Sequence, residues 1–172
     1  MPAPFNTIDL ATLSLKAGQA RCLEIEIQPE GLNLGGEYYG FAGDAVEARL
    51  DVSRTTSGFA FRLRADPALE GRCMRCLAES GFAFSVDSRE VHQPASGDEE
   101  LESPYVDGDE LDVSAWAHDA IALAVPQALL CKPDCAGLCP ECGISLNDIE
   151  PGTHTHEKPP DPRWAKLREL MD

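Results

Sequence analysis

The chain of 172 residues has no long hydrophobic run and few aromatic or basic residues. Its longest strongly apolar stretch, residues 115–131, is interrupted by a histidine, an aspartate and a proline, which excludes a membrane-spanning helix there. No basic segment leads into an apolar one at the start, so we expect no export signal and a cytoplasmic protein that does not bind membranes. The content of 43% hydrophobic and 26% charged residues is typical of a soluble globular chain.

Positive charge is scarce throughout the sequence. Fourteen lysines and arginines stand against thirty aspartates and glutamates, which gives a net charge of −16. Such a surface repels phosphate over much of its area, so nucleic-acid binding driven mainly by counterion release is not expected. Residues 93–130 hold nine acidic residues and no lysine or arginine, which is more than half of the excess. A basic protein is therefore a more natural partner than bare nucleic acid.

The sequence also lacks the motifs of zinc enzymes. A catalytic zinc keeps an open coordination position and works beside an acid–base carboxylate, typically within H-x-E or H-E-x-x-H. Neither pattern occurs in this chain. We therefore expect a non-enzymatic protein without a small-molecule substrate, and a zinc-dependent hydrolase or deaminase is excluded on chemistry.

Alternating apolar and polar residues predict strands over residues 1–92. Leu23, Ile25 and Ile27 alternate with polar residues, and two further alternating runs flank the turn at residues 54–58, which is typical of a β-hairpin. Because each strand has one polar face, an antiparallel sheet or partial barrel is favoured over a parallel sheet. The cysteine of the first strand, Cys22, is expected to be a small core residue.

Two other segments of the β-rich region give less regular patterns. The run that contains Phe82, Phe84 and Val86 predicts one strand, directly after the tight connection that carries Cys73 and Cys76. Residues 7–15 are expected to form a short helix.

The remaining chain divides into three segments. Residues 93–112 hold eight acidic residues with prolines and glycines, and predict a solvated acidic linker with almost nothing to bury. Residues 113–130 predict a helix that begins after the capping residue Asp112 and ends or kinks at Pro126. Residues 131–172 predict a zinc-knuckle segment that ends in a helix over residues 161–171. The whole is expected to be one compact domain of the α+β class.

The strongest signal in the chain is its spacing of cysteines. Cys139-Pro-Glu-Cys142-Gly is typical of a knuckle, a tight turn that directs two thiolates at one metal ion. In a reducing compartment such pairs indicate metal or redox chemistry more often than disulfides. The redox interpretation requires a βαβ context that the pattern does not predict.

A knuckle supplies only two ligands, so further ligands must come from elsewhere. Eight candidates are present, enough for two tetrahedral zinc sites: Cys73, Cys76, Cys131, Cys135, Cys139, Cys142, His154 and His156. Pairing by chain order places Cys139 and Cys142 with the two histidines, and the other four cysteines together. One site made of the four cysteines from residue 131 to 142, with Cys73 and Cys76 left out, is the alternative.

At these residues the sequence resembles the YceD family of large ribosomal RNA subunit accumulation proteins. The resemblance rests on C-x-R-C-L at residues 73–77, L-x-x-P at 123–126, C-x-x-x-C-x-G-L-C-P-x-C-G-x-x-L-N at 131–147 and D-P-R at 161–163. Many members carry C-x-C where this chain has His154-Thr155-His156, an exchange that a metal site permits. The resemblance implies a non-enzymatic cytosolic factor needed for large-subunit ribosomal RNA to accumulate.

The sequence therefore supports two hypotheses of function. The favoured hypothesis is ribosome biogenesis through binding, with structural Zn²⁺ and with ribosomal RNA or a basic large-subunit ribosomal protein as partner. The alternative is a zinc-ribbon-like adaptor in transcription or another nucleic-acid process that acts through protein contacts. Arginines around the hairpin and first knuckle can form a local RNA-facing patch, although such residues are usually the polar face of a sheet. They are Arg49, Arg54, Arg62, Arg64, Arg72, Arg75 and Arg89.

Overall fold

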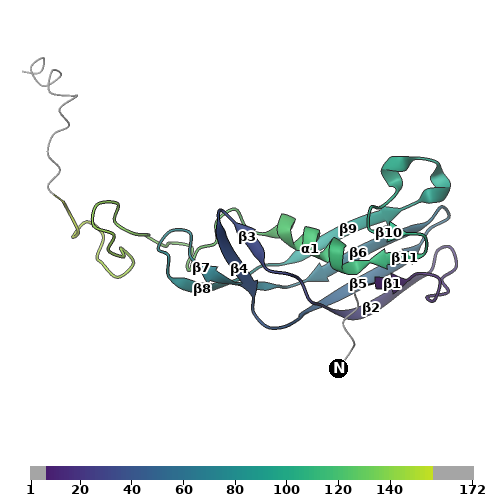
Figure 1. Cartoon of the computed structure of the whole chain (residues 1–172), viewed down its shortest axis with the longest axis horizontal. Coiled ribbons are helices and arrows are strands. Elements are labelled where there is room, and N and C mark those ends of the chain that lie inside the picture. Colours follow the sequence, from purple (N-terminus) through teal and green to yellow (C-terminus); the bar gives the residue numbers. More distant parts are fainter. Residues whose placement is uncertain (1–6, 157–172) are drawn as a thin grey trace, which may run out of the picture.

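The computed structural model describes residues 7–156. The helix expected over residues 161–171 lies outside the described residues. Figure 1 shows an elongated molecule, with the helix and sheets in one part and the cysteine-rich chain after residue 130 at the far end. No helix within residues 7–156 is long and apolar enough to cross a membrane.

The largest sheet contains the hairpin that the alternation predicted. It has four antiparallel strands in the order β2-β5-β6-β9. Their bounds are β2 Ala20–Ile27, β5 Val46–Arg54, β6 Phe59–Ala65 and β9 Val86–His92. The apolar residues of β5 and β6 are buried on one face, as the pattern requires, and Leu50 and Leu63 lie opposite each other with no exposed surface. The expectation for Cys22 is wrong, because its side chain lies on the exposed face of β2.

A second antiparallel sheet carries the first cysteine pair. Its order is β3-β4-β7-β8, with β3 Leu32–Leu34, β4 Glu37–Phe41, β7 Ala68–Arg72 and β8 Glu79–Ala83. The single strand expected through Phe82, Phe84 and Val86 is wrong. β8 ends at Ala83 and β9 begins at Val86, because the chain crosses between the two sheets at Phe84, whose N–H donates to Pro67 O at 3.1 Å.

The helix α1, Val113–Ala124, begins where the sequence predicted. The side chain of Asp112 accepts a hydrogen bond from Ala115 N at 2.9 Å and so caps the first turn. The buried face of α1 consists of Val113, Trp116, Ala117, Ala120 and Ile121. The helix stops before Pro126, which cannot continue it, and packs on the large sheet beside β9 and β2.

A small third sheet replaces the helix expected at residues 7–15. β1 (Thr7–Asp9) pairs with β11 (Glu110–Asp112), which also pairs with β10 (Val106–Asp107). The carboxylate of Asp9 accepts from Ala11 N at 2.8 Å, and Thr12 Oγ1 donates to Asp9 O at 2.7 Å. The expected helix is wrong because these local hydrogen bonds favour a turn over a helix.

The acidic segment is ordered into two 3₁₀ turns before it reaches β10, η1 Pro94–Ser96 and η2 Glu99–Leu101. Ser103 N donates to the buried His92 Nδ1 at 3.2 Å, and Gln93 N donates to Leu101 O at 2.8 Å. The expectation that this segment buries almost nothing is wrong for Ser103 and for Leu111, which is 0% exposed. Its carboxylates from residue 98 to 102 are exposed, as expected.

The fold class is therefore α+β and rich in antiparallel sheet, as predicted. The three sheets of the described chain remain separate, with no closed barrel among residues 7–156. The arrangement matters for function because the turn between β7 and β8 projects toward the end of the molecule where the chain arrives after α1 (Figure 1).

Candidate metal centres

Four cysteines from two distant segments meet at the end of the second sheet. Cys73 and Cys76 lie in the turn between β7 and β8, and Cys131 and Cys135 lie in the loop that follows α1. The Sγ atoms of Cys73 and Cys135 are 3.8 Å apart, and those of Cys76 and Cys131 are 3.6 Å apart. All four sulfur atoms lie within 4.8 Å of one another.

Hydrogen bonds to backbone carbonyls hold the two segments in this position. Met74 N donates to the carbonyl of Leu129 at 2.9 Å, and Arg75 Nη1 donates to the carbonyl of Cys135 at 3.0 Å. A Cβ at position 137 would lie only 3.3 Å from Arg75 O, and Gly137 has φ +79°, so this position favours glycine on both counts. The loop is thereby fixed to the first knuckle by main-chain contacts as well as by its thiols.

The electrostatics of this group favour a bound cation. Burial opposes ionisation of Cys73, but the backbone N–H groups of Cys76, Cys131 and Arg75 donate to its sulfur and lower its pKa to about 6. Burial raises the pKa of Cys131 to about 12, with hydrogen bonds among the neighbouring thiols and the charge of Cys73 acting in the same direction. Four thiolates therefore cannot form together here unless a positive charge is placed among them.

The spacing of the sulfur atoms fits tetrahedral zinc. With Zn–S bonds of about 2.3 Å, neighbouring sulfurs of a tetrahedron lie about 3.8 Å apart. The two Sγ–Sγ distances of 3.8 and 3.6 Å match that edge. A disulfide would instead require sulfurs about 2.05 Å apart, and the cysteines of the chain are all free thiols.

A second group lies further along the same end of the molecule. Cys139 Sγ is 3.2 Å from His156 Nε2, Cys142 Sγ is 3.3 Å from His154 Nε2, and the two Nε2 atoms are 2.9 Å apart. A tetrahedral zinc would place sulfur and nitrogen about 3.6 Å apart and two nitrogens about 3.3 Å apart. The observed distances follow the same order and are a few tenths of an ångström shorter, so this donor set also fits zinc.

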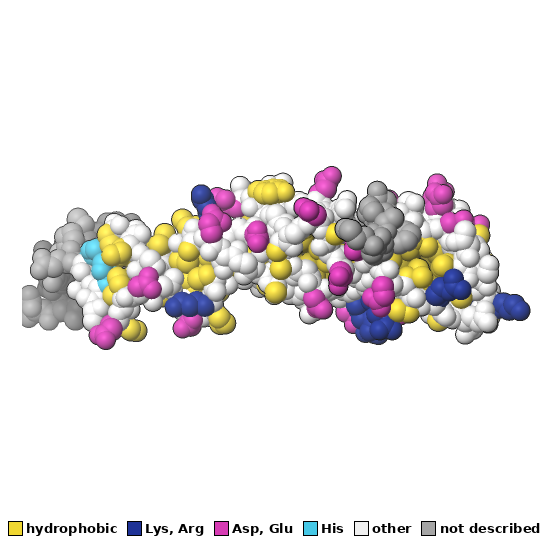
Figure 2. All heavy atoms as spheres, turned by 90° about the horizontal axis from the view of Figure 1, so that it is seen from below, with side chains coloured by type: hydrophobic (Ala, Val, Ile, Leu, Met, Phe, Trp, Pro, Cys, Tyr) yellow, Lys and Arg dark blue, Asp and Glu magenta, His cyan; other side chains and the backbone are white. Residues whose placement is uncertain are grey.

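The surroundings of the second group differ from those of the first. Cys142 is exposed, and Figure 2 shows histidine side chains at the surface of this end of the molecule. The backbone N–H groups of Cys142 and Glu141 donate to Cys139 and lower its pKa to about 6. Glu141 Oε2 lies 3.6 Å from His156 Nδ1, the ring nitrogen that faces away from the group, where a carboxylate can orient a ligating imidazole.

The two knuckles adopt the same backbone turn. In the first, Cys73 N donates to Ala78 O at 2.8 Å and Leu77 N donates to Cys73 O at 3.0 Å. In the second, Cys139 N donates to Ile144 O and Gly143 N to Cys139 O, both at 2.8 Å. The fifth residue is left-handed in both, with φ +59° at Leu77 and +73° at Gly143. The first pair is therefore a knuckle with leucine in place of the usual glycine.

The structure brings the eight candidate residues together in the two groups that pairing by chain order suggested. The alternative, one group of Cys131, Cys135, Cys139 and Cys142, is not the arrangement found. Sequence reasoning missed Asn147, which binds two consecutive residues of the first group's loop: its Oδ1 accepts from Ala136 N at 2.8 Å and its Nδ2 donates to Cys135 Sγ at 3.5 Å. The family motif at residues 131–147 ends in this asparagine, and that was the signal in the sequence that could have identified it.

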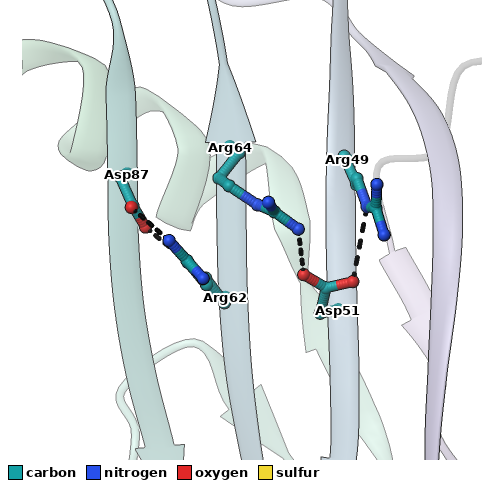
Figure 3. Close-up of polar contacts among 5 residues, drawn as sticks. All are labelled: Arg49, Asp51, Arg62, Arg64 and Asp87. Carbon is teal, nitrogen blue, oxygen red and sulfur yellow. Dashed lines mark hydrogen bonds and ion pairs between the residues drawn. The ribbon is translucent and has the colours of Figure 1, made fainter.

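Three of the arginines on the large sheet form ion pairs with aspartates of the same sheet. On the outer face of β5, β6 and β9, Arg62 Nη2 lies 2.6 Å from Asp87 Oδ2, and both Arg49 and Arg64 bind Asp51 (Figure 3). Hydrogen bonds from Arg62 hold the pKa of Asp87 below its usual value. Most of this positive charge is neutralised locally, which is what the polar face of a sheet requires.

Comparisons with known proteins agree with the motifs. Residues 61–171 match the model of the family described as large ribosomal RNA subunit accumulation protein YceD. The chain is 39% identical over 106 residues to an uncharacterized protein of Mycobacterium tuberculosis, covering 59% of this chain and 50% of that protein. It is 30% identical over 95 residues to a protein of Zea mays named large ribosomal RNA subunit accumulation protein YCED homolog 1, chloroplastic, covering 53% of this chain and 32% of that protein.

The chain thus spans half or less of the length of these relatives. No solved structure matches it.

Proposed function

The chain belongs to the YceD family, and from this membership we propose that it is a non-enzymatic factor that supports accumulation of large-subunit ribosomal RNA in the cytoplasm. The proposal assigns it to ribosome assembly and has it act by binding. The printed name of the Zea mays relative supports this role. The donor groups support it too, because both consist of four protein ligands and so leave no open position for catalysis.

The observation that carries the structural part of the proposal is the pair of four-ligand groups. Cys73, Cys76, Cys131 and Cys135 would hold one Zn²⁺ ion. Cys139, Cys142, His154 and His156 would hold a second. The zinc would supply the positive charge that lets clustered thiols ionise. The bound ions would also fix the cysteine-rich chain after residue 130 relative to the sheets.

The partner is proposed to be ribosomal RNA or a basic large-subunit ribosomal protein. The acidic segment, defined as residues 93–112, holds eight carboxylates and no base. The contact between Ser103 and His92 and the bond from Gln93 N to Leu101 O hold it beside the large sheet while its carboxylates stay in solvent. An ordered array of carboxylates attracts a basic surface from a distance and loses that attraction in salt.

Loss of the protein from cells tests the biological role. Large-subunit ribosomal RNA should fall relative to small-subunit RNA, and re-expression of the chain should restore the ratio. A ratio that stays the same after depletion excludes the role in large-subunit assembly.

A neutralised variant tests the acidic segment. Asp98→Asn, Glu99→Gln, Glu100→Gln and Glu102→Gln keep the shape of each side chain, and Asn can still accept the bond from Glu100 N that Asp98 now accepts. Association with purified large-subunit ribosomal proteins should slow at low salt and depend less on salt, while zinc content and thermal stability stay unchanged. An unchanged association rate would mean that the segment only connects β9 to α1 and does not contribute to partner binding.

A further inference from the structure

β2 is an eight-residue strand at the edge of the large sheet, with no other strand of residues 7–156 on its outer side. Figure 1 shows it along the lower edge of the sheet. Long open edges are hazards that proteins usually shorten, cover or block, because their unpaired N–H and C=O groups can bind another extended chain. Because no described strand covers this edge, its length requires an explanation.

The hydrogen-bond pattern identifies the residues that face outward. Arg54 N donates to Gln19 O, so residue 19 and the alternate residues after it bond to β5. The backbone N–H and C=O groups of Ala20, Cys22, Glu24 and Glu26 then point away from the sheet. These four residues offer a ladder for one more antiparallel or parallel strand.

An apolar groove opens beside this ladder. It has a volume of about 250 Å³ and lies between β2 and the turn after β1. Its apolar lining comes from Ile8, Leu13, Leu23 and Ile25. Three of these side chains are at most 7% exposed, so the floor of the groove is part of the core. A strand added to β2 would direct every second side chain toward this groove, because side chains alternate between the faces of a sheet.

The opposite face of the edge is acidic. The side chains of Glu24 and Glu26 lie on the outer face of β2, next to Arg49 and Glu47 of β5, respectively. Arg49 shares the carboxylate of Asp51 with Arg64, whereas Glu26 and Glu47 are two carboxylates directly opposite each other. The other side chains of an added strand would therefore meet carboxylates.

We propose that β2 is a docking edge for an extended, basic segment of a partner polypeptide, in which apolar residues alternate with lysine or arginine. The segment adds a strand to the large sheet by backbone hydrogen bonds. Its apolar side chains enter the groove, and its basic side chains lie beside Glu24 and Glu26. This goes beyond the proposed function, because it concerns the sequence and conformation of the segment bound and holds whatever process the partner serves.

A second copy of this chain is the less favourable occupant. Pairing β2 with β2 would place the glutamates of both copies on one face of the joined sheet, and like charges on neighbouring strands repel one another. A basic segment replaces that repulsion with attraction.

The test uses the full chain and a synthetic peptide of alternating valine and lysine, as long as β2. Amide hydrogen exchange of the wild-type protein should slow at Cys22, Glu24 and Glu26 when the peptide is added. The amides of Leu23 and Ile25 already bond to β5 and should change less. A peptide of the same composition in scrambled order, without alternation, is the matched control and should bind at least about tenfold more weakly.

Two variants separate the backbone from the charge. Glu24→Pro removes an outward N–H without breaking a bond to β5, and proline is tolerated on such an edge; it should weaken peptide binding by at least about tenfold. Glu24→Gln keeps the N–H and should weaken peptide binding less than Glu24→Pro does. Equal binding of the scrambled peptide, unslowed exchange along β2, or a wild-type dimer joined through β2 in sedimentation and exchange experiments would each overturn the proposal. The exchange measurement decides the matter even if the proline variant does not fold.

Discussion

Replacing Cys135 with alanine should destabilise far more of the molecule than replacing Cys142. Cys135 is 1% exposed and belongs to the group that joins the β7–β8 turn to the loop after α1. In that group Cys76 and Cys131 are 55 positions apart, whereas Cys142 and His154 in the second group are 12 apart. A longer closed loop restricts the unfolded chain more strongly.

The magnitude follows from the loop lengths. If a zinc ion constrains the unfolded chain as a cross-link does, closing the loop of 55 positions is worth about 4 kcal/mol and closing that of 12 about 3 kcal/mol. The larger loop contains β8, β9, the acidic segment and α1, so its release affects the folded core. The smaller loop contains only the chain around residues 142–154, so its release leaves the sheets intact.

The assay combines zinc content, denaturant unfolding followed by circular dichroism, and limited proteolysis. The wild type should carry two zinc ions and each variant one. Cys135→Ala should lower the unfolding free energy by about 4 kcal/mol, while Cys142→Ala should leave the unfolding of the sheets unchanged and expose only the chain after residue 138 to protease. Cys22→Ala, at an exposed thiol outside both groups, is the control. Wild-type protein without zinc, or equal destabilisation by the two variants, would refute this reasoning.

Two further predictions concern the sheets and the acidic segment. Leu111→Ala should lower the unfolding free energy by about 2–5 kcal/mol because Leu111 is 0% exposed, whereas Leu123→Ala, at a position 88% exposed, should change it by less than about 0.5 kcal/mol in the same denaturant titration. Arg62 holds the pKa of Asp87 below 3.8, so ionised Asp87 stabilises the folded state above that pH. Asp87→Asn should therefore be less stable than the wild type at pH 7. The difference should disappear as the pH falls through the lowered pKa, and a difference independent of pH would contradict the assigned ion pair.

The sequence predicted those strands and helices in which buried side chains recur at the regular spacing of a strand or a helix. The alternating residues of β2, β5 and β6 and the stripe on α1 report one buried face each, so their positions follow from pattern alone. Phe84 continues the alternation of β8 but lies where the chain changes sheets, a tertiary event that a local pattern does not record. The turn at Asp9 was missed because a side chain that accepts backbone hydrogen bonds competes with a helix of the same composition.

The donor groups were predictable for a different reason. Cysteine and histidine spacing specifies a ligand set almost independently of the fold that carries it. What the spacing does not record is support from outside the motif, such as the contact of Arg75 with the carbonyl of Cys135. Leu111 was missed because eight carboxylates around it give the segment the composition of a linker, although one leucine suffices to anchor a strand to the core.

The distance along the chain between the two halves of the first cysteine group determines when this group can be completed during synthesis. A ribosome adds Cys131 roughly 3 to 11 s after Cys76, at about 5–20 residues per second. During that interval β9 is made and the large sheet can close, while the first cysteine group has only two of its four thiols. The proposed zinc ion would find half a site if it met the nascent chain early, so full coordination would wait until α1 has left the ribosome. The newest protein in a cell would then be the fraction most exposed to thiol oxidation and most sensitive to the supply of zinc.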